Sequence, residues 1–151
     1  MLSLWNINTQ VRRDHLLPPG VVTTALQMTQ DGLQCYLAQD DGQIVLWSLR
    51  EQTAVPLSPI MPPVPGKKFQ SALCLSLSAD GQTLAAGGEN GTVIIWDRRQ
   101  PWAAGVILTP PEGASESGPI TALSMDAGGG VLATAGSPLT VRQGRQRGIV
   151  K

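Results

Sequence analysis

The chain has 151 residues, the size of one ordinary domain; 42% of them are hydrophobic and only 15% are charged. This composition is typical of a folded chain rich in buried strands, and it excludes a disordered chain, which needs a high net charge and few apolar residues. Lys and Arg together number 11, as do Asp and Glu, so no net charge attracts nucleic acid or an anionic membrane.

The start of the chain and its cysteines indicate where the protein works. Residues 1–13 carry neither a long apolar stretch nor a small-residue cleavage site, which argues against a signal peptide. No run approaches the roughly 18 apolar residues of a transmembrane helix. Two cysteines, Cys35 and Cys74, are too few for a secreted disulfide scaffold. We therefore expect a cytoplasmic or nuclear protein without a membrane partner.

Four segments of the chain repeat one another. The first ends with LSLW at residues 2–5, which matches IVLW at residues 44–47. Residues 25–48 align without a gap with residues 74–97, and a third copy begins at Ile120. A sequence that recurs at intervals of some tens of residues is the signature of a repeat architecture, so the fold follows from the repeat unit.

Each copy has the pattern of short β-strands joined by tight turns. In the second copy, Leu75 and Leu77 alternate with serines, which is the period of a half-buried strand. Asp80-Gly81 and Asn90-Gly91 predict tight turns, because glycine adopts the positive φ that such turns need. The predicted strands of this copy cover residues 75–78, 83–87, 92–96 and 104–108. The acidic turn residues Asp31, Asp41 and Asp80 are expected to act as turn formers.

The sequence offers no constellation of catalytic residues. The one histidine, His15, has no acidic partner in a recognisable motif, and we expect it to be an exposed loop residue. Cys35 and Cys74 are expected to be small buried hydrophobes. Residues 86–91 are glycine-rich but lie in a predicted turn between strands, whereas a phosphate loop opens a helix. We therefore predict a protein that is not an enzyme and has no cofactor or metal site.

The repeated pattern resembles the WD repeat, whose units supply about four strands at a period of roughly 40–45 residues. IIWD at residues 94–97 carries the complete Trp-Asp pair, whereas Trp47-Ser48 and Trp5-Asn6 keep only the Trp. The Gly-His pair that begins many WD repeats is absent, so the polar network built on that His is not expected here. The resemblance covers most of the chain.

The resemblance implies an all-β fold: a partial β-propeller of about three WD-type four-stranded blades, too few to close a ring alone. Gly144 aligns with Trp96, so the repeat pattern breaks off near Val141. The expected parts are a blade tail at 1–17, a blade at 21–57, a blade at 69–108, a partial blade at 119–141 and an atypical basic tail at 142–151. We interpret that tail as a terminus foreign to the repeat, and expect exposed blade faces that favour association.

The resemblance further implies a protein–protein interaction scaffold within an intracellular complex. The candidate partner-binding residues surround the Trp-Asp strand, because Trp and Arg are favoured at interface hot spots. They are Asp97, Arg98, Arg99 and Trp102. Trp102 has a competing interpretation, in which it packs between adjacent blades.

Two alternative functions stay open. Residues 84–99 are similar to the box found in WD-repeat substrate receptors of cullin-4 ubiquitin ligases. In that reading Arg99 would pair with an acidic surface of the ligase adaptor, and Asp97 would orient the turn. The second alternative is weak nucleic-acid binding by the basic tail at 142–151, against which the zero net charge and the lack of interleaved aromatic residues argue.

Overall fold

The computed structural model describes residues 1–57, 71–89, 91–100, 105–108 and 118–136, and the backbone of 140–143 and 149–150. These residues form antiparallel β-sheets and no helix, which confirms the predicted all-β class. The first sheet has two strands, β1 (Leu2–Asn6) and β2 (Val11–His15). The second sheet has β3 (Thr23–Met28), β4 (Gln34–Gln39), β5 (Ile44–Ser48) and β6 (Thr53–Pro56).

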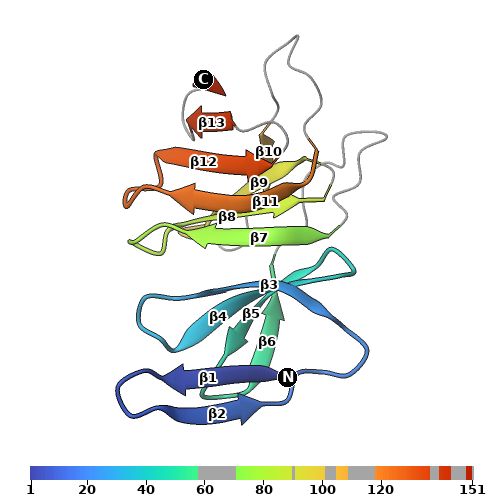
Figure 1. Cartoon of the computed structure of the whole chain (residues 1–151), viewed down its shortest axis with the longest axis vertical. Helices are drawn as coiled ribbons and strands as arrows, with labels where there is room; N and C mark the ends of the chain where they lie inside the picture. The colour runs from blue at the N-terminus through green and yellow to red at the C-terminus, as the bar shows by residue number, and fades with distance from the viewer. Residues whose placement is uncertain are drawn as a thin grey trace.

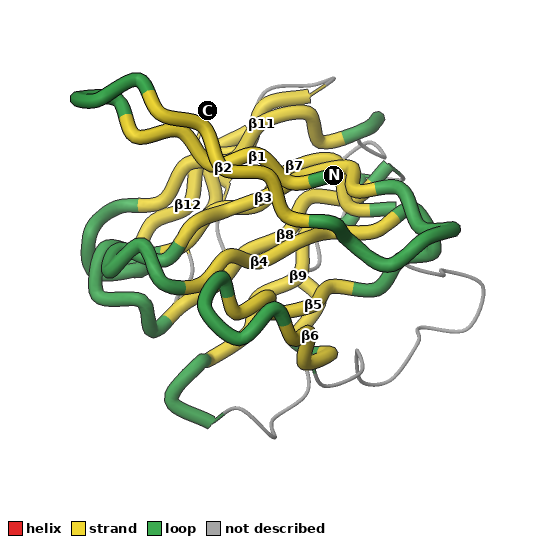
Figure 2. Tube along the Cα trace, turned by 90° about the horizontal axis from the view of Figure 1, so that it is seen from below, coloured by secondary structure: helices red, strands yellow, loops and turns green. Residues whose placement is uncertain are grey.

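The third and fourth sheets repeat this four-stranded order. The third has β7 (Ala72–Leu77), β8 (Thr83–Gly88), β9 (Val93–Asp97) and β10 (Val106–Leu108). The fourth has β11 (Ile120–Met125), β12 (Val131–Gly136), β13 (Thr140–Gln143) and β14 (Ile149–Val150). Figure 1 shows the four sheets stacked in chain order. Figure 2 shows the stack from below, where the strands of successive sheets overlie one another and the turns lie at the ends of the strands. The sheets resemble successive propeller blades, and the described residues close no ring.

The turn that joins the first two strands of a repeat is built from one acid and one hydroxyl. Asp31 Oδ1 accepts hydrogen bonds from Thr29 Oγ1 at 2.6 Å and from the Leu33 backbone N–H at 2.9 Å. Asp80 Oδ1 accepts the equivalent bonds from Ser78 Oγ at 2.6 Å and from the Gln82 N–H at 3.0 Å. The predicted role of these two acids as turn formers is confirmed, and Asp41 likewise accepts from the Gln43 N–H at 2.9 Å.

The third repeat makes the same turn with a different residue. Gly129 has a φ of 70°, close to the 72° of Gly81, and its N–H donates to the Asp126 carbonyl at 3.1 Å. Asp126 stands where Ser78 stands, and its Oδ1 accepts the Val131 N–H at 2.8 Å as Ser78 Oγ accepts the Thr83 N–H at 3.0 Å. The third repeat thus carries its acidic residue, Asp126, at the position of Ser78, two residues before the position of Asp80. The φ of the turn glycine is nearly the same in both repeats.

The first strands of neighbouring sheets are joined by side-chain contacts to backbone carbonyls. Thr24 Oγ1 donates to the Ala72 carbonyl at 2.5 Å, which links the second sheet to the third. Cys74 Sγ lies 3.3 Å from the Ile120 carbonyl, which links the third sheet to the fourth. Burial raises the pKa of the Cys74 thiol and that of Cys35, the latter to about 11. Such thiols are poor nucleophiles at neutral pH.

The hydrophobic core lies in layers between the sheets rather than at one centre. Trp47 belongs to the cluster between the first and second sheets, and Trp96 to the cluster between the second and third. The third cluster contains Ile120 and Leu132, each at most 1% exposed, together with Val93 and Ala85. Each sheet therefore buries apolar side chains against its neighbours, as expected for stacked repeats.

Two regions differ from the expectations drawn from the sequence. His15 is the last residue of β2, and it is half-buried with a buried Nδ1 atom. The prediction that His15 is an exposed loop residue is therefore wrong. It aligns with Leu57 of the next repeat, a position just after the outer strand. The expected boundary at residue 141 falls within β13, which pairs with β12 and β14. The fourth sheet thus includes Arg142 and Gln143 as well as residues 149–150.

Candidate protein-interaction surface

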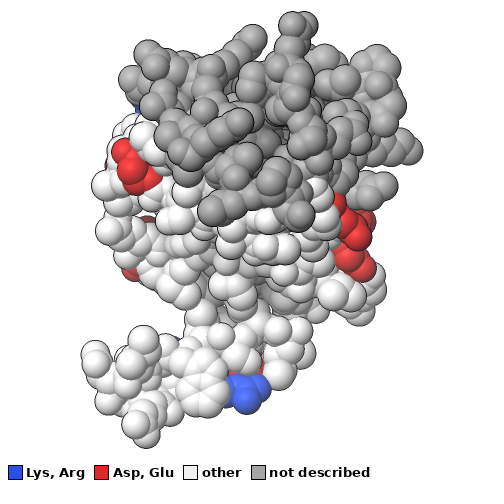
Figure 3. All heavy atoms as spheres, turned by 45° about the horizontal axis from the view of Figure 1, so that its top comes forward, with Lys and Arg blue, Asp and Glu red and all other residues white. Residues whose placement is uncertain are grey.

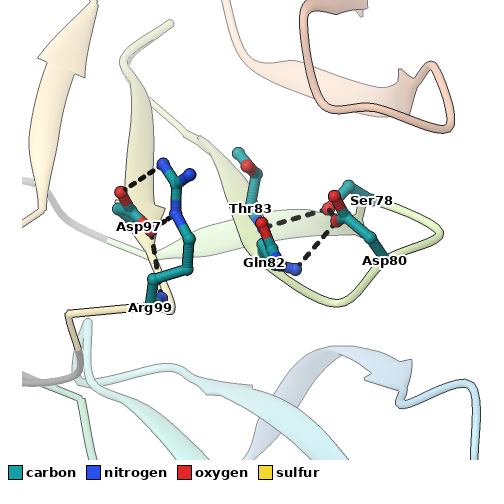
Figure 4. Close-up of polar contacts among 6 residues, drawn as sticks. All are labelled: Ser78, Asp80, Gln82, Thr83, Asp97 and Arg99. Atoms are coloured by element: carbon teal, nitrogen blue, oxygen red, sulfur yellow. Dashed lines mark hydrogen bonds and ion pairs between the residues drawn. The ribbon is translucent and has the colours of Figure 1, made fainter.

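Two turns of the third sheet lie side by side at one end of its strands. One is the turn between β7 and β8 at residues 78–83, and the other follows β9 at residues 97–100. The Arg98 backbone N–H donates to the Gln82 carbonyl at 2.7 Å and holds the two turns together. Figure 4 shows Asp97 and Arg99 at the end of β9, beside Asp80 and its turn.

Asp97 closes its own turn and holds the side chain of Arg99. Its Oδ1 accepts the Arg99 backbone N–H at 3.0 Å and the Arg99 Nε at 2.9 Å, and its Oδ2 accepts Nη2 at 2.7 Å. The side-chain hydrogen bonds from Arg99 are the largest cause that lowers the pKa of Asp97. The Arg99 side chain remains 57% exposed and that of Asp97 37%, so the ion pair lies at the surface.

Asp80 adds a second carboxylate beside this pair. Its pKa is lowered by the hydrogen bond from Ser78, by the Gln82 N–H and, to a smaller extent, by the charge of Arg99. Arg99 thus lies among acids of two turns, and its own pKa is raised, mainly by the bond to Asp97. We call Asp80, Asp97 and Arg99 together the Arg99 surface.

Arg98 points to a different place from Arg99. Its Nε donates to the Tyr36 hydroxyl at 3.0 Å, and its guanidinium carbon lies 5.6 Å from the centre of the Tyr36 ring. Tyr36 is on β4 and is 4% exposed, so this half-buried contact joins the second sheet to the third. The sequence analysis missed Tyr36, because no local pattern relates residues that are 62 positions apart.

The structure thus brings together three of the four residues predicted at this site but gives them different environments. The side chains of Arg99 and Asp97 are exposed to solvent, whereas Arg98 of the third sheet bonds to Tyr36 of the second sheet. Trp102 lies outside the described residues. Figure 3 shows a face on which most of the described atoms belong to residues without charge, and acidic side chains lie at its left and right edges. In the described part of the chain, no group of three or more His, Cys, Asp or Glu is arranged to hold a metal, and no helix is suited to cross a membrane.

Residues 65–97 match the family model described as "WD domain, G-beta repeat". This match contains the β7–β8 turn with Asp80 and the Trp-Asp strand with Asp97, and it ends two residues before Arg99. The sheets around it repeat the same strand order. This part of the chain is similar to the WD repeat. The predicted resemblance is therefore confirmed, as are the WD-type blades.

Comparisons with known WD-repeat proteins agree with this assignment. Over 105 residues the chain is 29% identical to the protein groucho of Drosophila melanogaster, and this covers 66% of the chain and 13% of groucho. The structure superposes on that of U3-55K with a TM-score of 0.69 and 20% identity, over 92% of this chain and 40% of that one. A chain of the mitotic checkpoint complex gives a TM-score of 0.73 and 16% identity, over 99% of this chain and 42% of that one.

These similarities establish the propeller fold. Since the chain spans 13% of groucho and about two-fifths of the structural neighbours, the activities and partners of those whole proteins are not transferred to it. WD-repeat propellers typically act as protein-interaction scaffolds and are generally not catalytic.

Proposed function

We propose that this chain is a protein-interaction scaffold of an intracellular complex, acting by binding and without a catalytic step, and that the Arg99 surface contacts a partner. The observation that carries the proposal is the exposed Arg99 guanidinium, held in place by Asp97 at the end of a WD strand. An arginine whose rotamer is already fixed loses less conformational entropy when a partner binds. The turn that carries Arg99 is tied to the β7–β8 turn by the hydrogen bond from the Arg98 N–H to the Gln82 carbonyl.

The chemistry of the surface indicates what a partner must supply. The bonds to Asp97 use Nε and one hydrogen of Nη2, and a guanidinium has five N–H donors. The other donors suit a carbonyl or carboxylate oxygen of the partner. Asp80 is itself an acceptor, so a partner that also offers a basic or N–H group fits better than a purely acidic one.

A cullin-4 ubiquitin-ligase adaptor is the second candidate for that partner. The Trp-Asp-x-Arg order of residues 96–99 and the exposure of Arg99 support it, because that family box places an exposed arginine after the Trp-Asp pair. The flanking Asp80 would have to be accommodated by a basic group of the adaptor.

The test compares two arginines that occupy the same position in successive repeats. Arg99 has Asp97 two residues before it, whereas Arg50 is exposed and has Ser48 there. Affinity capture from cells, followed by mass spectrometry, is done with the wild type, Arg99→Ala and Arg50→Ala. We expect Arg99→Ala to lose one set of proteins that Arg50→Ala retains. Loss of cullin-4 and its adaptor supports the ligase candidate, and an unchanged set for Arg99→Ala overturns the Arg99 surface.

A further inference from the structure

Arg98 is a half-buried cation that has no acid to pair with in the described part of the chain. Its Nε donates to the Tyr36 hydroxyl at 3.0 Å, and no described carboxylate lies within ion-pair distance of its guanidinium. Asp97, the neighbouring acid in the chain, gives both of its oxygens to Arg99. The positive charge of Arg98 is therefore not balanced by a nearby side chain that the structure describes.

The repeat shows that the packing of the sheets does not require a cation at this position. Arg98 aligns with Leu49 of the second sheet, which packs against the apolar cluster between the first and second sheets. Tyr36 aligns with Ala85 of the third sheet, which is fully buried in the cluster between the third and fourth sheets. A half-buried charge without a counter-charge has a desolvation cost that leucine does not have. The contact between Arg98 and Tyr36 is thus a departure from the repeat that sheet packing leaves unexplained.

The two side chains also keep hydrogen-bond donors that have no acceptor among the described residues. A guanidinium has five N–H donors, and the bond to Tyr36 uses only the one on Nε, so those on Nη1 and Nη2 are free. The Tyr36 hydroxyl accepts that bond, and its own hydrogen has no acceptor in the same part of the chain. Beside Tyr36 toward the turns, the second sheet has Gln34 paired with Ser48, and neither residue is charged. The site therefore offers positive charge and several donors, and it has no acid of its own.

We propose that Arg98 and Tyr36 form a binding site for the carboxylate of an acidic side chain of a partner protein, at the turn end of the layer between the second and third sheets. The carboxylate accepts N–H groups of Arg98 and the O–H of Tyr36, and it supplies the counter-charge that Arg98 lacks. Arginine suits this role because its planar guanidinium can bond to both oxygens of one carboxylate. Tyr36 holds the guanidinium in advance, through its hydroxyl and through its ring, whose centre lies 5.6 Å from the guanidinium carbon.

The site lies at the turns where the Arg99 surface lies. Arg98 belongs to the turn that follows β9, is only half-buried, and ties this turn to the β7–β8 turn through its backbone N–H. Figure 4 shows Asp80, Asp97 and Arg99 on the same two turns. The proposal rests on the interaction function proposed above and adds a second contact to it. A partner segment would place an acidic residue at Arg98 and a basic or N–H group at Asp80.

The test measures the affinity of the whole chain for hexaglutamate by isothermal titration calorimetry at low ionic strength, with hexaglutamine as the neutral control peptide. The wild type is expected to bind hexaglutamate and not hexaglutamine. Arg98→Leu, which copies Leu49 of the second repeat, is expected to weaken this binding about tenfold by removing a charge-assisted hydrogen bond. Tyr36→Phe keeps the ring and removes the hydroxyl, and is expected to weaken it about threefold. Arg50→Leu is the matched control, because it removes the same charge from an exposed turn, and it is expected to bind as the wild type does.

Failure of the wild type to bind hexaglutamate, or equal weakening by Arg98→Leu and Arg50→Leu, overturns the site. Loss of binding in Arg99→Ala but not in Arg98→Leu also overturns it, because the acidic ligand would then lie at the Arg99 surface. If hexaglutamate binding depends on Arg98 while Arg99→Ala captures the same proteins as the wild type, this site stands and the Arg99 surface fails.

Urea denaturation separates binding from a purely structural role of Arg98. Arg98→Leu is expected to unfold at an equal or higher urea concentration than the wild type, because it removes a half-buried charge that lacks a counter-charge. A lower unfolding midpoint together with unchanged hexaglutamate binding would show that Arg98 stabilises the layer and binds no carboxylate.

Discussion

Single carboxylates fix the geometry of this protein by accepting local hydrogen bonds. Asp31, Asp80 and Asp97 each accept an N–H from two residues further along the chain, and each has a lowered pKa. In Asp31 and Asp80 the hydroxyl two residues earlier is the largest cause of that shift, and in Asp97 it is the Arg99 side chain. Aspartate thus closes the first turn of the second and third sheets, through Asp31 and Asp80, and holds the Arg99 side chain through Asp97.

The lowered pKa of Asp80 predicts how its contribution depends on pH. The folded-state pKa lies below the ordinary value of 3.8, so the stabilising effect is complete above about pH 4 and is lost as the pH falls through the folded-state value. We therefore expect Asp80→Asn to unfold at a lower urea concentration than the wild type at pH 7, and the difference to shrink toward pH 2. Glu51→Gln, at an exposed position, serves as the control, and a difference that does not vary with pH would contradict the prediction.

At the scale of the element, strands and turns could be predicted because they depend on neighbouring residues. Alternating apolar residues and the turn signals placed the ends of β8 and β9 within one residue of those observed, and the start of β7 three residues late. The Asp97–Arg99 pair was also within reach of sequence reasoning, since its atoms belong to residues two positions apart. The strand β2 and its His15 were missed, because its run VRRDH is polar and forms a strand only through pairing with β1.

The first turn of the third repeat gives a prediction at this scale. Gly129 has a φ of 70°, and an added Cβ there would lie 2.8 Å from Thr83 Oγ1 and 3.0 Å from Thr83 Cβ. Gly128, next to it, has ordinary φ and room for a Cβ, with Asp126 Oδ2 at 3.9 Å as the nearest atom. We expect Gly129→Ala to lower the free energy of unfolding by about 1–2 kcal/mol. Gly128→Ala is expected to change it little or to raise it slightly.

Urea denaturation of the two glycine variants measures this difference directly. Because both variants add the same methyl group to the same turn, the comparison removes the general effect of replacing glycine. Equal midpoints for the two would show that the left-handed conformation and the contact with Thr83 do not constrain the turn.

At the scale of the whole molecule, the contacts between sheets were beyond the sequence analysis. Repeats indicate that sheets stack, and they do not show which side chains meet across a layer. Arg98 with Tyr36, and Cys74 with the Ile120 carbonyl, join residues that are 62 and 46 positions apart. Stability of a stacked array depends on these nearest-neighbour layers, so they decide how the molecule unfolds.

The layers between sheets show a complementary choice of residue size. Ala38 of the second sheet and Gly87 of the third occupy the same repeat position, and they face Ala72 and Ile120, respectively. A Cβ added to Gly87 would lie 2.5 Å from Ile120 Cγ2 and 2.8 Å from Cys74 Sγ. The small residue in the third sheet is therefore matched to the large one in the fourth, while the layer before it uses alanine on both sides.

This complementarity predicts that Gly87→Ala and Ile120→Ala are coupled. Gly87→Ala alone overpacks the layer, at a cost of about 1–3 kcal/mol. Ile120→Ala alone removes a fully buried side chain and costs about 2–5 kcal/mol. The double variant recreates the alanine pair of the preceding layer, so its loss in free energy of unfolding, measured in urea, is expected to be smaller than the sum of the two. Additive losses would mean that Gly87 and Ile120 do not limit each other, and that the fourth sheet is held by contacts elsewhere in the layer.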